Sequence, residues 1–184
     1  MQVYEFKMKK YTVSSSIPYQ LELTQQLLNI TNKILSENIN NSDWIKRLLD
    51  WGNQHIKNNS TIFPRTEKEV LSGKKISLRW NRLVYIPTEL CYLKQLKILE
   101  LNNNNLTKLP REIGTLKNLE ELNLNINNLI NLPDEIIQLE HLKVLNIKNN
   151  KYLELTNKQI SWLESLVFKG CTIIYDKHKF NIEE

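Results

Sequence analysis

The side chains that could carry catalysis are few in this sequence and stand far apart. The three histidines, His55, His141 and His178, share no motif with a cysteine or a carboxylate. The sequence has no glycine-rich phosphate loop, no Gly-x-Ser-x-Gly segment and no His-Glu-x-x-His segment. Carboxylate pairs such as Glu120-Glu121 fall at surface positions, where nothing focuses two of them into one pocket. The sequence therefore predicts a protein that is not an enzyme and that holds no cofactor.

The two cysteines, Cys91 and Cys171, lack the neighbours that a metal site needs. Neither belongs to a Cys-x-x-Cys pair or stands beside a histidine, so no metal is predicted. The N-terminus mixes charges among its apolar residues and has no uninterrupted apolar core of a cleaved leader. Because the cytosol is reducing, two free thiols are expected. The expected location is the cytoplasm, or a host cell that the protein reaches as an effector without a cleaved signal peptide.

The charge of the chain is slightly basic and evenly spread. Its net charge is +5 and its isoelectric point is near 9.1. Residues 1–72 carry nine basic and seven acidic side chains, residues 73–164 carry thirteen and ten, and residues 165–184 carry three and three. This distribution lacks the concentrated basic stripe that a phosphate backbone requires, so nucleic acid is not the expected partner. No run of 18 apolar residues occurs, so no membrane span is predicted.

The remaining candidates for function belong to an internal repeat of 23 residues that runs from Gly73 to Glu164. Its aligned columns are Ile76, Leu99, Leu122 and Leu145; Leu78, Leu101, Leu124 and Ile147; and Asn81, Asn104, Asn127 and Asn150. Each copy predicts a short strand, a turn at the aligned asparagine and a return segment that starts at a proline. The asparagine amide can bond to backbone groups where the chain leaves the sheet. One copy cannot bury its own apolar edge, so the four copies must stack.

The pattern LxxLxLxxNxLxxLPxxIxxLxx resembles the 23-residue leucine-rich repeat of bacterial proteins. The resemblance covers half of the chain, with three well-matched copies and a fourth that departs after Leu153. It implies an α/β (α+β) solenoid, a curved right-handed superhelix with short parallel β-strands on its concave face. Members of the family usually bind other proteins on that face.

Both ends of such a solenoid expose apolar core and therefore need caps. The expected organisation is an N-terminal segment and helical cap over residues 1–72, four repeats over 73–164, and a C-terminal capping strand and tail over 165–184. With both caps the chain would form a complete unit. Residues 1–16 are expected to form a peripheral strand or frayed tail, or else a docking or translocation segment.

Helix signals support both caps. Pro18 begins a helix predicted over residues 19–36, and Ser42 suits the N-cap of a second helix whose apolar stripe holds Trp44 and Trp51. Capping boxes at Thr66 and Thr156 predict two further helices. The predicted C-terminal helix should bury Trp162 and Phe168 in the cap core, and residues 171–176 alternate as a last strand.

The candidate binding residues are the outward positions of the predicted strands, because successive side chains on a strand face opposite ways. They are Lys75, Ser77, Arg79, Trp80, Ile98, Glu100, Asn102, Glu121, Asn123, Asn125, Val144, Asn146 and Lys148. Trp80 is either an exposed anchor or a side chain that leans on the cap helices.

The variable positions predict a module that binds a partner protein of unknown identity on its concave face, as an effector or an adaptor. One alternative is a structural or self-associating module in which residues 1–16 add a strand to a second copy. A second alternative, a weak nucleic-acid binder, is motivated by the isoelectric point alone. A monomer is expected, with weak self-association as its alternative.

Overall fold

The computed structural model describes residues 26–28, 43–57 and 61–176. Residues 1–42 and 43–184 form two separate compact units, and the described residues of the first, 26–28, are helical. The segment predicted over residues 1–16, most of the helix predicted over 19–36 and the tail after residue 176 therefore lie outside the described residues. The repeats belong to the second unit.

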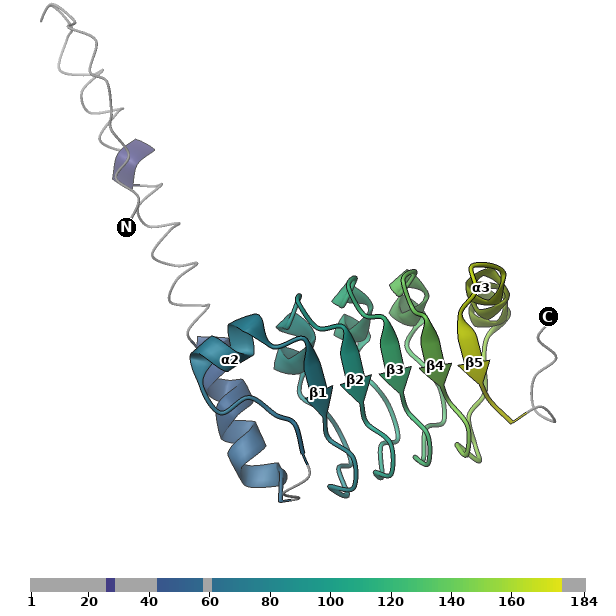
Figure 1. Ribbon diagram of the computed structural model, residues 1–184, viewed down its shortest axis with the longest axis horizontal. Helices are drawn as coiled ribbons and strands as arrows, with labels where there is room; N and C mark the ends of the chain where they lie inside the picture. Colours follow the sequence, from purple (N-terminus) through teal and green to yellow (C-terminus); the bar gives the residue numbers. More distant parts are fainter. Residues whose placement is uncertain (1–25, 29–42, 58–60, 177–184) are drawn as a thin grey trace, which may run out of the picture. The chain divides into compact units, whose positions relative to one another are not determined.

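Five short parallel strands lie side by side in chain order and form the sheet of the second unit (Figure 1). They are β1 (Lys75–Ser77), β2 (Ile98–Glu100), β3 (Glu121–Asn123), β4 (Val144–Asn146) and β5 (Thr172–Ile174). Ile76 pairs with Leu99 and Leu99 pairs with Leu122, so the register between strands follows the 23-residue period. These inward side chains are buried. The predicted strands and the predicted inward columns are confirmed.

The return segments of the first three repeats are short 3-10 helices, each of which follows a proline. They are η1 (Thr88–Tyr92), η2 (Arg111–Thr115) and η3 (Asp134–Gln138). Pro87, Pro110 and Pro133 stand at their N-caps with φ between −65° and −72°. A proline fits there because its ring fixes this φ. The N–H groups at the start of a helix have no acceptor within the helix, so the N–H that proline lacks is not missed. Ile113 and Ile136 point inward from these helices and are fully buried.

A ladder of buried asparagines joins neighbouring repeats. Asn127 Nδ2 donates to the carbonyl oxygens of Leu101 and Leu124, both at 3.0 Å, and its Oδ1 accepts from Leu106 N at 3.0 Å. Asn104 and Asn150 make the equivalent bonds one repeat before and one repeat after. Asparagine suits this column because its amide offers a donor and an acceptor at once. The predicted ladder is confirmed.

A helical cap covers the β1 end of the sheet (Figure 1). Residues 43–55 are helical, and Trp44 and Trp51 are buried in the core as predicted. Between this helix and β1, Ile62 pairs antiparallel with Ser77, with N···O distances of 2.9 and 2.8 Å in the two directions. The cap therefore both buries apolar side chains and occupies the edge of β1.

Helix α2 (Glu67–Ser72) begins at the predicted N-cap. Thr66 Oγ1 accepts a hydrogen bond from Glu69 N at 3.3 Å. The Glu69 carboxylate accepts from Arg65 N at 2.7 Å, and not from the Thr66 N–H that a capping box uses. The reciprocal bond of the predicted box is therefore shifted by one residue.

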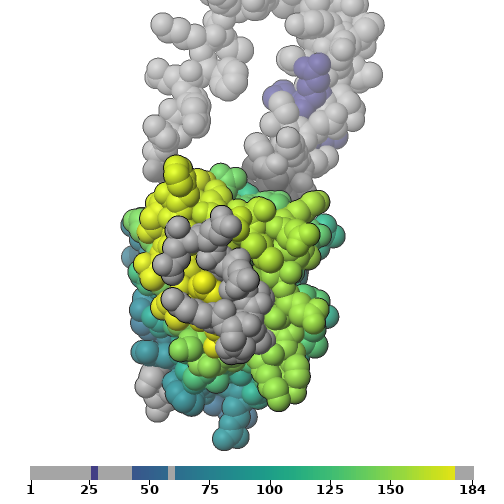
Figure 2. Space-filling view, turned by 90° about the vertical axis from the view of Figure 1, so that its right-hand side faces the viewer, coloured from purple at the N-terminus to yellow at the C-terminus, as the bar shows by residue number. Residues whose placement is uncertain are grey.

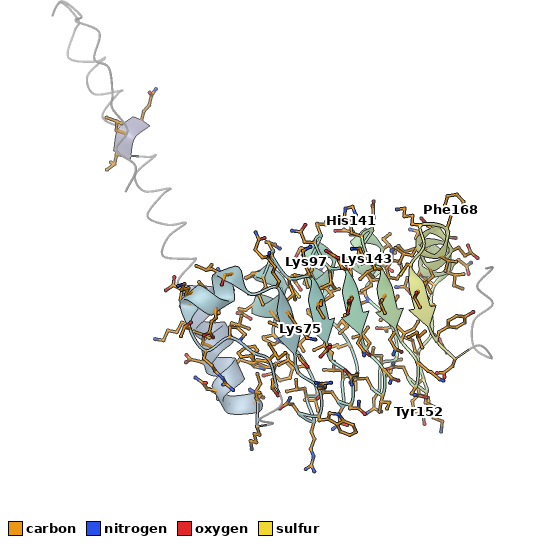
Figure 3. The ribbon with its side chains drawn as sticks, viewed as in Figure 1. Lys75, Lys97, His141, Lys143, Tyr152 and Phe168 are labelled. Carbon is orange, nitrogen blue, oxygen red and sulfur yellow. The ribbon has the colours of Figure 1, made fainter. Side chains whose placement is uncertain are left out.

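The opposite end carries helix α3 (Asn157–Phe168) and strand β5, which are yellow in the end-on view of Figure 2. Both bonds of the capping box between Thr156 and Gln159 are present, and Gly170 (φ 87°) follows the helix. Trp162 is buried as predicted, but Phe168 is 94% exposed, so its assignment to the cap core is wrong (Figure 3). Phe168 lies two residues beyond the buried Leu166, about 200° around the helix, and so on its outer face.

The capped α/β solenoid predicted from the repeat is confirmed. Its core is continuous from the helix of residues 43–55 to Cys171. None of the helices within the described residues has the length and apolar character needed to span a bilayer.

Candidate functional site

The outward side chains of the repeats form three rows across the concave face. The strand register sets the first two rows, which are Lys75, Ile98, Glu121 and Val144, and then Ser77, Glu100, Asn123 and Asn146. Two residues further along each repeat comes the third row, Arg79, Asn102, Asn125 and Lys148. The structure therefore brings the predicted residues to one face, with Trp80 next to its third row.

Ser77 is the exception to the predicted exposure, because its side chain is fully buried. Ile62 pairs with Ser77 along the edge of β1, and the side chains of Lys75 and Glu100 meet beside it. A partner cannot reach a side chain enclosed in this way. Ser77 is therefore removed from the candidate binding residues.

An ion pair neutralises Lys75 in the first repeat. Lys75 Nζ lies 2.8 Å from Glu100 Oε1. Burial favours the neutral acid, but the hydrogen bond from Lys75 and the positive charges of Lys75 and Arg79 outweigh it and lower the pKa of Glu100 below its ordinary value. Glu100 is therefore a carboxylate at neutral pH, and it neutralises Lys75.

Two asparagines in the second row are held by the backbone of their own repeats. Asn123 Oδ1 accepts from Asn125 N at 3.1 Å, and Asn146 Oδ1 accepts from Lys148 N at 3.2 Å. Within the described part of the chain, neither side-chain Nδ2 group has a partner. Because β3 and β4 are neighbours, these two donors stand one strand spacing apart, about 4.8 Å. The middle of the face thus presents two fixed amide donors.

Trp80 occupies a left-handed backbone position that recurs in every repeat. Its φ is 62°, and φ is 59° at Asn103, 53° at Ile126 and 59° at Asn149. Asparagine tolerates this region, but a β-branched residue rarely adopts it. Trp80 is 65% exposed, so it does not lean on the cap helices as one of its two predicted readings required.

Ile126 is a surface residue that the sequence reasoning missed. It stands in the same column as Trp80 and is 45% exposed. The column itself held the signal, since Asn103 and Asn149 are of the residue type that left-handed positions prefer. Isoleucine does not suit this left-handed backbone conformation, so local structure does not explain why it stands there.

At the edge of the sheet where the strands begin, one carboxylate binds two lysines. Glu120 accepts hydrogen bonds from Lys97 Nζ at 2.5 Å and from Lys143 Nζ at 2.6 Å. The hydrogen bonds from Lys143 and from Lys97 lower the pKa of Glu120 to about 2. Figure 3 shows Lys97, Lys143 and His141 along this edge, and His141 is exposed.

The cysteines contribute no reactive site. Both thiols are free and buried, and burial raises the pKa of Cys91 to about 12. Among the residues that the structure describes, no group of three histidine, cysteine or carboxylate side chains is placed to hold a metal ion.

Comparison with known proteins places these features in a family. A family model described as a leucine-rich repeat region matches residues 84–180, more than half of the chain. Proteins with this domain generally serve as protein-interaction modules and are typically scaffolds without catalytic activity. A search of curated proteins found no match.

Forty chains of solved structures also match. One is a leucine-rich-repeat protein of Leptospira interrogans, with 36% identity over 54% of this chain and a TM-score of 0.46. The present chain spans 24% of the length of that protein. The family-model match covers the stacked repeats from η1 to β5, including the buried asparagines described above, and this chain therefore belongs to the leucine-rich-repeat family.

Proposed function

We propose that this protein binds a partner protein through the concave face of its repeats, as an effector or an adaptor. The observation that carries the proposal is the pair of amide donors of Asn123 and Asn146. Their carbonyl oxygens are bonded to their own backbones, while their Nδ2 groups have no partner among the described residues. A donor that is already fixed loses little conformational freedom on binding, which favours affinity.

The surroundings of these amides define what the partner should offer. Ile98 and Val144 are half-buried in the row beside them, and the exposed Glu121 lies between those two. A matching segment would place oxygen acceptors opposite the asparagines and an apolar side chain near Ile98 or Val144. Trp80 supplies a large exposed ring at one end of the face, and tryptophan is enriched among the residues that dominate binding energy.

The test is capture of proteins from lysates of the protein's own cells and of candidate host cells. The wild-type chain is compared with the double variant Asn123→Arg and Asn146→Arg, which replaces the two amides by bulky cations. The matched control is Gln95→Arg and Asn118→Arg, because these exposed amide side chains follow the return helices and lie off both the concave face and the loops that follow the strands.

A partner of the concave face should be captured by the wild type and by the control, and its yield should fall about tenfold or more with the double variant. Equal urea midpoints for the three proteins would exclude misfolding as the cause. Equal capture by the double variant and the control would contradict the proposal.

A further inference from the structure

The loops that follow the strands collect nearly all of the exposed apolar residues of the repeats. We call residues 80–85, 103–108, 126–131 and 149–154 the loop edge; it is the lower edge in Figure 3, where Tyr152 is labelled. Its large exposed apolar side chains are Trp80, Val84, Tyr85, Ile126, Ile130 and Tyr152. Elsewhere between residues 73 and 164, Tyr92 is the single residue of this kind. Scattered surface leucines need no explanation, but a gathering along one edge marks an interaction site.

The charge of the loop edge is positive and, in part, unpaired. It carries Arg82, Lys108 and Lys151 against the single acidic residue Glu154. Arg82 and Lys108 form no ion pair with any described residue. At the opposite edge, by contrast, the carboxylate of Glu120 bridges two lysines. The loop edge therefore offers a partner positive charge beside its apolar side chains.

Two hollows on the loop edge combine apolar walls with a cation. The larger is open, has a volume of about 760 Å³ and is lined by Ile130, Tyr152, Leu155 and Ile160 together with Lys151 and Glu154. The smaller, of about 310 Å³, is lined by His55, Val84 and Tyr85 together with Lys57 and Arg82. Hollows of these sizes admit aromatic or aliphatic side chains, with an anionic group beside them.

The backbone at Ile126 supports a role in binding. A β-branched residue at φ 53° is strained, while Asn103 and Asn149 show that the same position can be filled without that strain. Ile126 is nonetheless kept there with 45% of its side chain exposed. Strain of this kind persists at sites where it serves function.

We propose that the loop edge is a second docking surface, for an acidic protein segment that also carries aliphatic or aromatic side chains. Its acidic groups would lie along Arg82 and Lys108, and its apolar side chains would enter the two hollows. Aliphatic side chains such as Val84, Ile126 and Ile130 offer little to a phosphate backbone, which argues against nucleic acid. Separate hollows suit individual side chains better than a bilayer surface does. This surface is distinct from the amide rows of the concave face, and Trp80 stands where the two meet.

The test uses the full chain and three labelled peptides of about 16 residues, followed by fluorescence anisotropy. One peptide alternates glutamate with leucine and phenylalanine. The second keeps the glutamates but replaces the apolar residues by glycine, and the third keeps the apolar residues but replaces glutamate by lysine. Vesicles containing phosphatidylserine and a 20-nucleotide single-stranded DNA serve as further probes.

The first peptide should bind about tenfold or more tightly than the other two. Its affinity should fall about fivefold or more in Ile126→Asn with Ile130→Asn, and also in Arg82→Gln with Lys108→Gln, because each pair removes one component of recognition. Asparagine occupies the equivalent position at Asn103 and Asn149 in the neighbouring repeats, so the variant with asparagine at residue 126 should fold. The concave-face variant Asn123→Arg with Asn146→Arg should bind the peptide as the wild type does.

Three results would overturn the inference. The first is equal binding of all three peptides, and the second is unchanged affinity in both loop-edge variants despite retained urea midpoints. The third is binding of the vesicles or the DNA, but not the peptide, with loss of that binding in the loop-edge variants. If only the concave-face variant loses peptide binding, the peptide binds to the concave face and not to the loop edge. The function proposed for the concave face would then still hold.

Discussion

Replacing Asn127 with alanine tests the account of how the repeats are joined. The substitution removes a long 3.5 Å contact with Asn125 O and the three shorter hydrogen bonds of the side chain, to the carbonyl oxygens of Leu101 and Leu124 and from the amide of Leu106. The two carbonyls keep another partner, because Asn104 Nδ2 lies 2.9 Å from Leu101 O and Asn150 Nδ2 lies 3.1 Å from Leu124 O. The buried N–H of Leu106 is therefore the one group that the substitution leaves without a partner.

The expected loss of stability depends on which of these groups keep a hydrogen-bond partner and which do not. A buried donor without a partner costs about 1–3 kcal/mol, and each of the other two bonds contributes about 1 kcal/mol net. The free energy of unfolding should therefore fall by roughly 3–5 kcal/mol. This is a large share of the roughly 5–15 kcal/mol that is typical of a folded domain.

Urea denaturation followed by circular dichroism measures the change, provided that the slope of the transition stays constant. Asn128→Ala is the matched control, since it makes the same chemical change one residue away on an exposed side chain. The control should lie within about 0.5 kcal/mol of the wild type. A loss below about 1 kcal/mol for Asn127→Ala, or a loss equal to that of the control, would refute the role assigned to the ladder.

Three further predictions concern the core, the charged edge and the thiols. Leu101→Ala should lower the free energy of unfolding by about 2–5 kcal/mol, because Leu101 is fully buried between repeats. Glu120 has a pKa lowered from 4.5 to about 2 by Lys97 and Lys143, so its stabilising effect should be complete above pH 4.5 and disappear as the pH falls to about 2. Urea unfolding of Glu120→Gln across this range, compared with wild type, measures that effect. Cys91, with a pKa of about 12, should react with a thiol reagent at pH 8 far more slowly in the native protein than in urea.

Each of these predictions can fail plainly. A loss below about 0.5 kcal/mol for Leu101→Ala would mean that the strand register is wrong. A constant difference between wild type and Glu120→Gln from pH 2 to pH 5.5 would contradict the lowered pKa. For Cys91, equal reaction rates in native and unfolded protein would show that the thiol is accessible. Added salt should weaken the Glu120 effect, because this carboxylate faces solvent.

The repeat made much of the fold predictable. Each structural role recurs at intervals of 23 residues, so the inward columns, the return prolines and the asparagine ladder could be assigned by comparing copies. The outward positions followed from the alternation of a strand. What those positions bind was not predictable, because the same alternation places any residue type outward.

The errors fall at the ends of the repeat array. Ser77 is buried because Ile62, from outside the repeats, pairs with it, and no column of the alignment contains that contact. Phe168 is exposed because the phase of α3 is set by Trp162 and Leu166 packing against the last repeat. In both places the exposure of the side chain depends on a contact with a neighbouring segment that is not repeated every 23 residues.

The sequence by itself determined the stacked repeats, the ladder that ties them and the face that varies, since local periodicity alone specifies these features. Tertiary structure decided which varied residues are available to a partner. It paired Lys75 with Glu100, gave Glu120 two lysines from neighbouring repeats and left the amides of Asn123 and Asn146 without partners. These outcomes depend on distances between side chains that are 23 or more residues apart in sequence, or on the direction in which one side chain turns, and a sequence pattern fixes neither.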